Sequence, residues 1–250
     1  MWNRCGRCTP LWCSLLEVSW LEQTAADLPD TDDWLSANEA QRLAGMRFAK
    51  RRADWRLGRW TAKHAVSLYL DLPAGAPSLA RVEIRPAPSG APEVFAGGEP
   101  APVTISISHR EGRAACAIAC PGVALGCDLE IAEPRGDAFA GDYFTAAEQA
   151  MVAQVSPAGR WHLLALLWSA KESVLKALRV GLRLDTRLVT VDPAGALLPA
   201  GENSWRPLHA HYEGQTFHGW WQQTGELVRT MVAVPAPAAP AAIASRRIDI

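Results

Sequence analysis

The 250-residue sequence contains no apolar run that approaches the ~20 residues needed to span a bilayer. Its first ten residues carry basic side chains but no apolar segment with a small-residue cleavage site, so they do not resemble a secretory signal. Hydrophobic residues make up 49% and charged residues 20%, which excludes a wholly disordered or collagen-like chain. We therefore expect a cytoplasmic globular protein without membrane association, built as one large domain or two small ones.

Net charge is also nearly absent, because 25 Lys and Arg oppose 26 Asp and Glu. This balance argues against coating nucleic acid through bulk electrostatics. The charges are nevertheless segregated: residues 42–63 hold eight basic side chains and one acid, and residues 128–148 hold six acids and one base. Such a pair of patches suits a ligand that carries phosphates and a metal, although two solvated faces would give the same pattern.

A second CxxC pair is missing as well. Cys5 and Cys8 form one CxxC motif, whereas a structural zinc site normally requires four ligands. The remaining cysteines lie mostly in apolar, strand-like sequence, where buried thiols act as small apolar residues.

Apolar periodicity, capping residues and turn residues predict an α+β chain. A helix is expected from a capping box at Ser36 and Glu39 to about residue 46, and a second from about 50 to 70. Strands are expected at residues 11–20, 81–85, 92–95, 103–109, 113–120, 123–131, 205–212, 216–222 and 227–234.

Three motifs recur at a nearly constant offset. Thr145 and Glu148 repeat the capping box after 109 positions, Trp168–Lys171 repeats Trp60–Lys63 after 108, and Val189–Pro193 repeats Val82–Pro86 after 107. The recurrence predicts two similar α+β halves in a pseudo-twofold arrangement. We expect an N-terminal half at 1–121, a C-terminal half at 122–234 and a mobile Pro/Ala-rich tail at 235–250.

Two carboxylates face one side of a predicted strand. Asp128 and Glu130 are two residues apart in Gly126–Glu130, so their side chains share a face. Mg²⁺ binds such oxygen ligands together with substrate phosphates. The alternative is an exposed strand edge with unrelated acids.

Two further segments carry polar side chains in patterns typical of a phosphate site. On the helix that contains Trp168, the side chains of Glu172 and Lys176 share a face, although an ordinary ion pair has the same spacing. Ser108 and His109 follow the apolar alternation of a strand and could receive a phosphate at its end. A structural histidine is the alternative there.

The sequence resembles the Sfp-type 4′-phosphopantetheinyl transferases in four features that occur in the same order. These are a basic early helix, Ser-His at a strand end, Gly-x-Asp-x-Glu and Trp-Ser-x-Lys-Glu-x-x-x-Lys. The resemblance covers about residues 48–177. It implies the two-halved fold of that family, and transfer of phosphopantetheine from coenzyme A (CoA) to a serine of a carrier protein with release of 3′,5′-ADP.

The resemblance also implies a set of site residues. Asp128, Glu130 and Glu172 match the Mg²⁺ ligands, Glu172 also matches the base for the serine, and Lys176 matches a pyrophosphate contact with Lys171 beside it. Ser108 and His109 match contacts to the nucleotide phosphates, Arg51 and Arg59 match the 3′-phosphate contacts, and Arg85 is a further contact. Where the family often has a lysine near the adenine, this chain reads Ser89-Gly90-Ala91-Pro92, which keeps the turn through Gly90 but not the lysine.

The implied partners are CoA, Mg²⁺ and an apo acyl or peptidyl carrier protein from a peptide synthetase, polyketide synthase or fatty acid system. Because both halves lie in one chain, we expect a monomer rather than a short trimeric holo-synthase. Two other functions remain open. One is a nucleic-acid-binding module built on residues 42–63 with Trp55 and Trp60; the other is a carrier-binding protein without catalysis.

Overall fold

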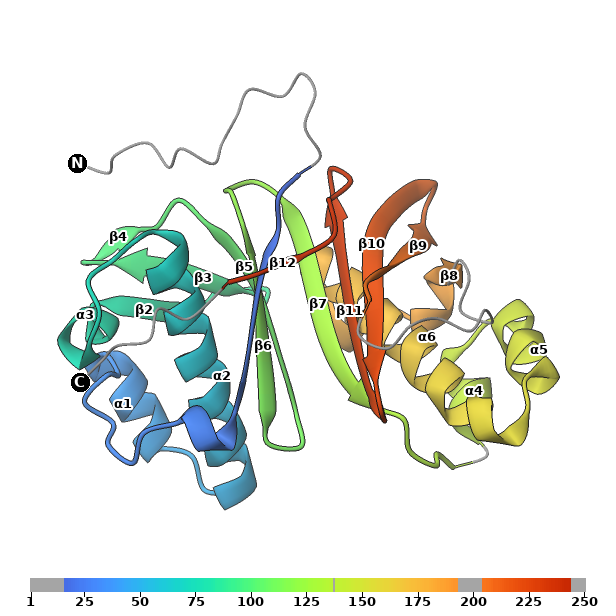
Figure 1. Ribbon diagram of the computed structural model, residues 1–250, viewed down its shortest axis with the longest axis horizontal. Helices are drawn as coiled ribbons and strands as arrows, with labels where there is room; N and C mark the ends of the chain where they lie inside the picture. The colour runs from blue at the N-terminus through green and yellow to red at the C-terminus, as the bar shows by residue number, and fades with distance from the viewer. Residues whose placement is uncertain (1–15, 137, 193–203, 244–250) are drawn as a thin grey trace. The chain divides into compact units, whose positions relative to one another are not determined.

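The computed structural model describes residues 16–136, 138–192 and 204–243. The chain is a mixed α+β protein that divides into two compact units (Figure 1). Unit 1 comprises Met1–Val123 with Pro240–Ile250, and unit 2 comprises Ala124–Ala239. The first unit therefore ends two residues after the boundary that the sequence predicts.

Unit 1 packs a long helix, α2, against a sheet of strand order β12-β1-β6-β5, and a second sheet has the order β2-β3-β4. Its elements are β1 (Ser19–Thr24), the 3-10 helix η1 (Ala25–Asp27), α1 (Ala37–Ala44), α2 (Ala49–Tyr69), α3 (Ala76–Ala80), β2 (Val82–Pro86), β3 (Pro92–Ala96), β4 (Glu99–Pro100), β5 (Thr104–Arg110), β6 (Arg113–Ala119) and β12 (Ala241–Ala242).

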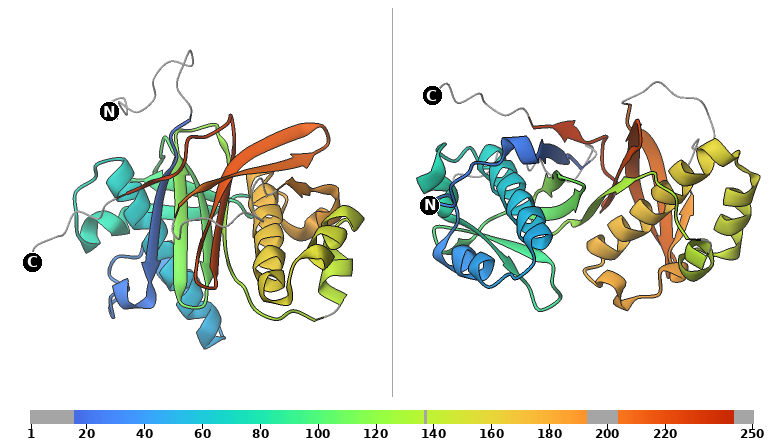
Figure 2. Two further views of the ribbon diagram at one scale, coloured as in Figure 1. Left: turned by 45° about the vertical axis from the view of Figure 1, so that its right-hand side comes forward. Right: turned by 90° about the horizontal axis from the view of Figure 1, so that it is seen from below.

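Unit 2 is a five-stranded sheet of order β7-β11-β10-β9-β8 with α6 along one face and α4 and α5 at the side of α6 (Figure 2). Its elements are β7 (Ala124–Ile131), α4 (Ala138–Tyr143), α5 (Ala146–Gln154), α6 (Pro157–Ala177), the 3-10 helices η2 (Gly181–Arg183) and η3 (Thr186–Leu188), β8 (Thr190–Asp192), β9 (Arg206–Tyr212), β10 (Gln215–Thr224) and β11 (Leu227–Val234).

The two units repeat one order of elements and of strands. Unit 1 runs β1, α1, α2, β2, β3, β5 and β6, and unit 2 runs β7, α5, α6, β8, β9, β10 and β11. The order β7-β11-β10-β9-β8 corresponds to β1-β6-β5 and β3-β2 in unit 1, where β3 lies against β5 without joining its sheet. The duplication inferred from three short motifs therefore extends to the topology of both units.

Capping residues start the equivalent short helices in the way that the sequence predicts. The Ser36 hydroxyl accepts from the Glu39 N–H, and the Glu39 carboxylate accepts from the Ser36 N–H. Thr145 and Glu148 form the same reciprocal pair at the start of α5. These bonds satisfy amide groups that have no partner inside the helix.

Two predicted segments differ from the structure. The first strand runs from Ser19 to Thr24 instead of 11–20. The polar end of β1 stays in the strand because β6 supplies backbone partners as far as Arg113, which pairs with Thr24. Residues 11–15 lie outside the described residues. The tail predicted to be mobile from residue 235 contains β12, which pairs in parallel with β1. Local composition does not reveal such long-range pairing.

The described cysteines include two buried thiols, Cys116 and Cys127, as expected, while the CxxC motif lies outside the described residues. Within the described ranges, no helix combines the length and the apolar character that a membrane crossing requires.

Candidate functional site

The acidic face of β7 lies against α6. A Cβ added to Gly126 would stand 1.7 Å from the Ser173 carbonyl oxygen, so the helix and strand backbones approach more closely than any side chain permits. Asp128 and Glu130 alternate onto the same face as Gly126, and both are buried. The strand therefore presents both carboxylates to α6, on the face that the sequence predicts.

Glu172 completes a group of three acids with Asp128 and Glu130. It is half-buried on α6, and burial together with the negative charges of Asp128 and Glu130 raises its pKa, against the opposing effect of Lys176. The three predicted metal ligands therefore share one electrostatic environment. We call these acids and Lys176 the acidic site.

Two cations balance the acids. The Lys176 ammonium donates to Asp128 Oδ1 at 2.7 Å and to the Cys127 carbonyl at 2.9 Å. Burial disfavours its charge, but the attraction of Asp128 and Glu172 outweighs this, and the pKa of Lys176 is raised. Arg135, which the sequence reading missed, donates to Glu130 at 2.8 Å.

The donor set of the acidic site fits a hard divalent cation. Three carboxylates supply the oxygen ligands that Mg²⁺ prefers. Burial is the main cause of the raised pKa of Glu172, and the negative charges of Asp128 and Glu130 add to it. As the side chains stand, Lys176 and Arg135 contact two of the carboxylates. Among the described residues, no three acidic, histidine or cysteine side chains converge to metal-ligand distances.

Buried hydroxyl groups hold α6 to the neighbouring strand. Thr230 of β11, directly opposite Asp128, shares hydrogen bonds of 2.8 Å with Ser169 and with Ser173. Sequence reasoning missed this cluster. Its signal was the spacing of Ser169 and Ser173, which places two small polar residues one turn apart on one face.

Aromatic rings flank the acidic site one turn before Glu172. Trp168 contacts Phe139 and Tyr143 of α4 at centroid distances of 5.5 and 4.8 Å. The guanidinium of Arg135 lies 5.2 Å from the centre of the Phe139 ring. The aromatic rings and the Arg135 guanidinium therefore lie beside the carboxylates.

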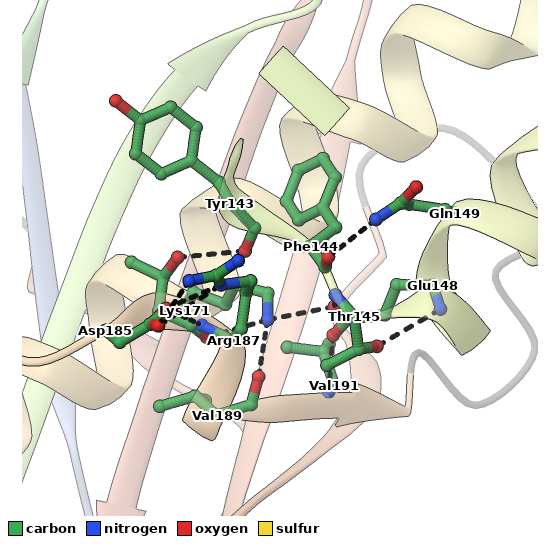
Figure 3. Close-up of polar contacts among 11 residues, drawn as sticks. Tyr143, Phe144, Thr145, Glu148, Gln149, Lys171, Asp185, Arg187, Val189 and Val191 are labelled. Atoms are coloured by element: carbon green, nitrogen blue, oxygen red, sulfur yellow. Dashed lines mark hydrogen bonds and ion pairs between the residues drawn. The ribbon is translucent and has the colours of Figure 1, made fainter. Parts of the chain in front are cut away.

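Lys171 is not a surface phosphate contact, contrary to the sequence prediction. Its side chain is fully buried, with an exposed fraction of 0%. The ammonium pairs with Glu148 at 2.9 Å and donates to the carbonyls of Thr186, at 2.9 Å, and Val189 (Figure 3). Burial lowers its pKa, and Glu148 opposes that effect. Lys171 and Lys176 lie close together in the sequence, and this closeness does not reveal that their side chains point in different directions.

In unit 1, Arg51 of α2 and His109 of β5 are both exposed. A Cβ at Gly58 would lie 3.7 Å from the His109 ring, and Arg51 stands two turns earlier on the same face of α2. Ser108 is buried and alternates to the opposite face of β5. Its side chain therefore does not join His109, contrary to the expectation that both emerge together.

Arg59 turns inward rather than converging with Arg51. Its side chain is 13% exposed, its Nε lies 3.9 Å from the Glu39 carboxylate, and its guanidinium is 5.0 Å from the centre of the Trp55 ring. Burial, opposed by Glu39 and reinforced by Arg42, lowers the pKa of Arg59 to about 10. The chain thus holds a cation at a site that disfavours its charge.

Arg85 and Gly90 lie on the β2–β3 hairpin. Arg85 is partly exposed, pairs with Glu83 at 2.9 Å and lies over Phe95 at 4.0 Å. Gly90 has φ +91°, which favours glycine, and its N–H donates to the Ala87 carbonyl in the turn. The turn that the sequence predicts at this point is present.

Much of the positive charge on α2 serves internal contacts. Arg52 donates to the Leu43 carbonyl at 2.7 Å, Arg56 pairs with Asp32 at 2.8 Å, and Lys63 is fully buried. Trp55 and Trp60 pack in a small hydrophobic cluster with Trp34. These positions leave little of the continuous basic and aromatic surface that a nucleic-acid-binding module needs.

Comparison with known proteins identifies part of the chain. Residues 124–229 match the family model described as the 4′-phosphopantetheinyl transferase superfamily. A solved structure of a holo-(acyl-carrier-protein) synthase from Bacillus anthracis str. Ames, in complex with CoA (3′,5′-ADP), is 20% identical, with a TM-score of 0.36, over 42% of this chain and 96% of that one. No curated protein matches the chain. The acidic site lies within the matched residues.

Proposed function

Because residues 124–229 form a domain of the 4′-phosphopantetheinyl transferase superfamily, we propose that the chain transfers 4′-phosphopantetheine from CoA to a serine of an apo acyl or peptidyl carrier protein. The observation that carries the proposal is the acidic site within this domain, where Asp128, Glu130 and Glu172 share one environment with Lys176. CoA and the carrier protein are the proposed partners, and the chain is expected to act as a cytoplasmic monomer.

The proposed step is a phosphoryl-type displacement. The serine Oγ forms a bond to the pantetheine-bearing phosphorus of CoA while the bond from that phosphorus to the bridging oxygen breaks, and 3′,5′-ADP leaves with the electron pair. Glu172 accepts the serine proton as the general base, the role that the resemblance implies for it. Lys176 stays protonated and donates to the pyrophosphate oxygens that gain charge.

Asp128, Glu130 and Glu172 would hold Mg²⁺ in this reaction. The ion would supply neutralisation of the charge on the pyrophosphate. Lys171 is excluded from the phosphate contacts by its burial.

The resemblance assigns CoA phosphates to unit 1, and Arg51 and His109 are the exposed side chains that support this. Arg59 remains a proposed 3′-phosphate contact because an anion would relieve its buried charge. Arg85 and the turn at Gly90 are proposed at the nucleotide on the resemblance alone.

A carrier-binding protein without catalysis is the second candidate, but it would not need three acids with a balancing lysine. The two functions are distinguished by incubating the protein with CoA, Mg²⁺ and apo carrier protein and measuring 3′,5′-ADP release by chromatography. We expect release that requires all three components and stops when EDTA is added. Carrier binding without release would support the second candidate and overturn the first.

A further inference from the structure

The buried pair Lys171–Glu148 is one of two equivalent pairs. In unit 1, Lys63 pairs with Glu39, and both side chains are buried. The two lysines are 108 positions apart and the two glutamates 109. Both units therefore contain the same buried lysine–glutamate pair.

The surrounding contacts repeat as well. Glu39 accepts from the Ile84 N–H at 3.1 Å, and Glu148 accepts from the Val191 N–H at 3.0 Å, so each glutamate joins the start of a short helix to a strand. Lys63 donates to the Leu79 carbonyl and Lys171 to the Thr186 carbonyl, again 107 positions apart.

The residue that follows the lysine distinguishes the two units. In unit 1 it is His64, and in unit 2 it is Glu172. Only in unit 2, therefore, does the pair stand next to a residue of the acidic site.

Both sequence neighbours of Glu172 have buried polar contacts outside α6. Lys171 contacts α5, η3 and the residue before β8, and the Ser173 hydroxyl contacts Thr230 of β11. Successive side chains are about 100° apart around a helix, so these contacts fix α6 on both sides of Glu172. Rotation of α6 would break one set or the other.

We propose that Lys171 and Glu148 are positioning residues that hold Glu172 toward Asp128 and Glu130, and that the equivalent pair in unit 1 takes no part in metal binding. This proposal rests on the proposed function, because the group that Glu172 meets is taken to be Mg²⁺. Residues that orient metal ligands typically change metal affinity by 10- to 100-fold when they are replaced.

The test uses matched double variants, K171M/E148Q and K63M/E39Q. Replacing both partners avoids leaving one buried charge alone, and a glutamine keeps an oxygen that can accept from the backbone N–H groups. Calorimetry measures Mg²⁺ binding to each full-length protein in the absence of CoA and carrier protein. Thermal unfolding is recorded alongside.

We expect K171M/E148Q to weaken Mg²⁺ binding at least tenfold and to raise the Mg²⁺ concentration for half-maximal transfer by a similar factor. K63M/E39Q should lose a similar amount of thermal stability while its Mg²⁺ affinity stays at the wild-type value. Equal Mg²⁺ affinities in the two variants would overturn the positioning role while leaving the proposed function intact. If the wild-type protein itself neither binds Mg²⁺ nor transfers, the proposed function fails instead. Should K171M/E148Q not fold, the single variants K171R and K63R give the same comparison, because arginine keeps a positive charge beside the glutamate while changing the geometry of its contacts.

Discussion

At the scale of single residues, Glu172 combines a cost to the fold with a role in the proposed reaction. Its pKa is raised in the folded chain, chiefly by burial, so folding favours the protonated form. At a pH above the pKa that Glu172 has in the folded chain, the ionised carboxylate therefore lowers the free energy of unfolding. This destabilisation disappears at a pH below about 4.5, the ordinary pKa of a glutamate side chain. Stability without Mg²⁺ should fall as the pH rises through this interval.

The substitution E172Q removes that cost together with the base. We expect a higher melting temperature than wild type at pH 7.5 without Mg²⁺, a difference that vanishes near pH 4, and a loss of transfer of roughly 10²–10⁴-fold. Scanning calorimetry and the transfer assay measure the two effects. The control E133Q makes the same change at a more exposed carboxylate of unit 2 and should alter neither. Near-native transfer by E172Q at saturating Mg²⁺ would refute its role.

Arg59 illustrates the same conflict in unit 1. Leu167 stands at the equivalent place in α6, 108 positions later, and is fully buried. Because the pKa of Arg59 is lowered to about 10, its charge disfavours folding at every pH below that value. An arginine kept where the other unit has a leucine indicates a requirement other than packing.

We expect R59L to melt above wild type at pH 7.5 and to bind CoA ten- to a hundredfold more weakly, which corresponds to a lost charge-assisted contact of about 1.5–3 kcal/mol. Affinity for dephospho-CoA should not change, because it lacks the 3′-phosphate. Calorimetric titration with both ligands makes the comparison, with the exposed Arg81 replaced in R81L as the control. Equal losses for CoA and dephospho-CoA would show that Arg59 does not read the 3′-phosphate.

At the scale of elements, unit 2 depends on the close approach of α6 to β7. A methyl group at Gly126 would overlap the Ser173 carbonyl, which belongs to the backbone and cannot rotate away. We expect G126A to lower the free energy of unfolding by more than about 3 kcal/mol, the upper range for overpacked cores. G136A adds the same methyl group in open space and should be neutral. Denaturant unfolding of both variants decides the matter, and equal midpoints would contradict the packing described.

The two long helices, the two capped helix starts and most strands could be predicted because their signals are local, whereas the short helices α3 and α4 were not predicted. The capping boxes at Ser36 and Thr145 fix two helix starts, and alternating apolar residues mark β5. The start of β1 and the pairing of β12 were not predictable, since both depend on partners far away in the chain.

The acidic site was predictable to a different extent. Its three acids lie in two short motifs: the strand motif places Asp128 and Glu130 on one face, and the helix motif places Glu172 on one face with Lys176. The inward turn of Lys171 and Arg59 depends on Glu148 and Glu39, whose helices lie at some distance in the sequence. A basic side chain near a motif can be a ligand contact or a buried partner, and the motif does not distinguish the two.

At the scale of the whole molecule, two units with one topology carry unequal chemistry. The paired lysine and glutamate, the long helix and the strand order occur in both, but the acids of the acidic site occur in unit 2. The predicted pseudo-twofold arrangement of the units stays a prediction. So does the site that it would form from the phosphate contacts of unit 1 and the acids of unit 2.

The most direct measurement of the central claim is the intact mass of an apo carrier protein after incubation with this protein, CoA and Mg²⁺. We predict that the carrier gains the mass of one phosphopantetheine group, that fragmentation places it on a single serine, and that 3′,5′-ADP appears in equal amount. The gain should disappear with E172Q and remain with E133Q. A panel of acyl and peptidyl carrier proteins that all keep their apo mass, while an established transferase modifies them under the same conditions, would contradict the claim.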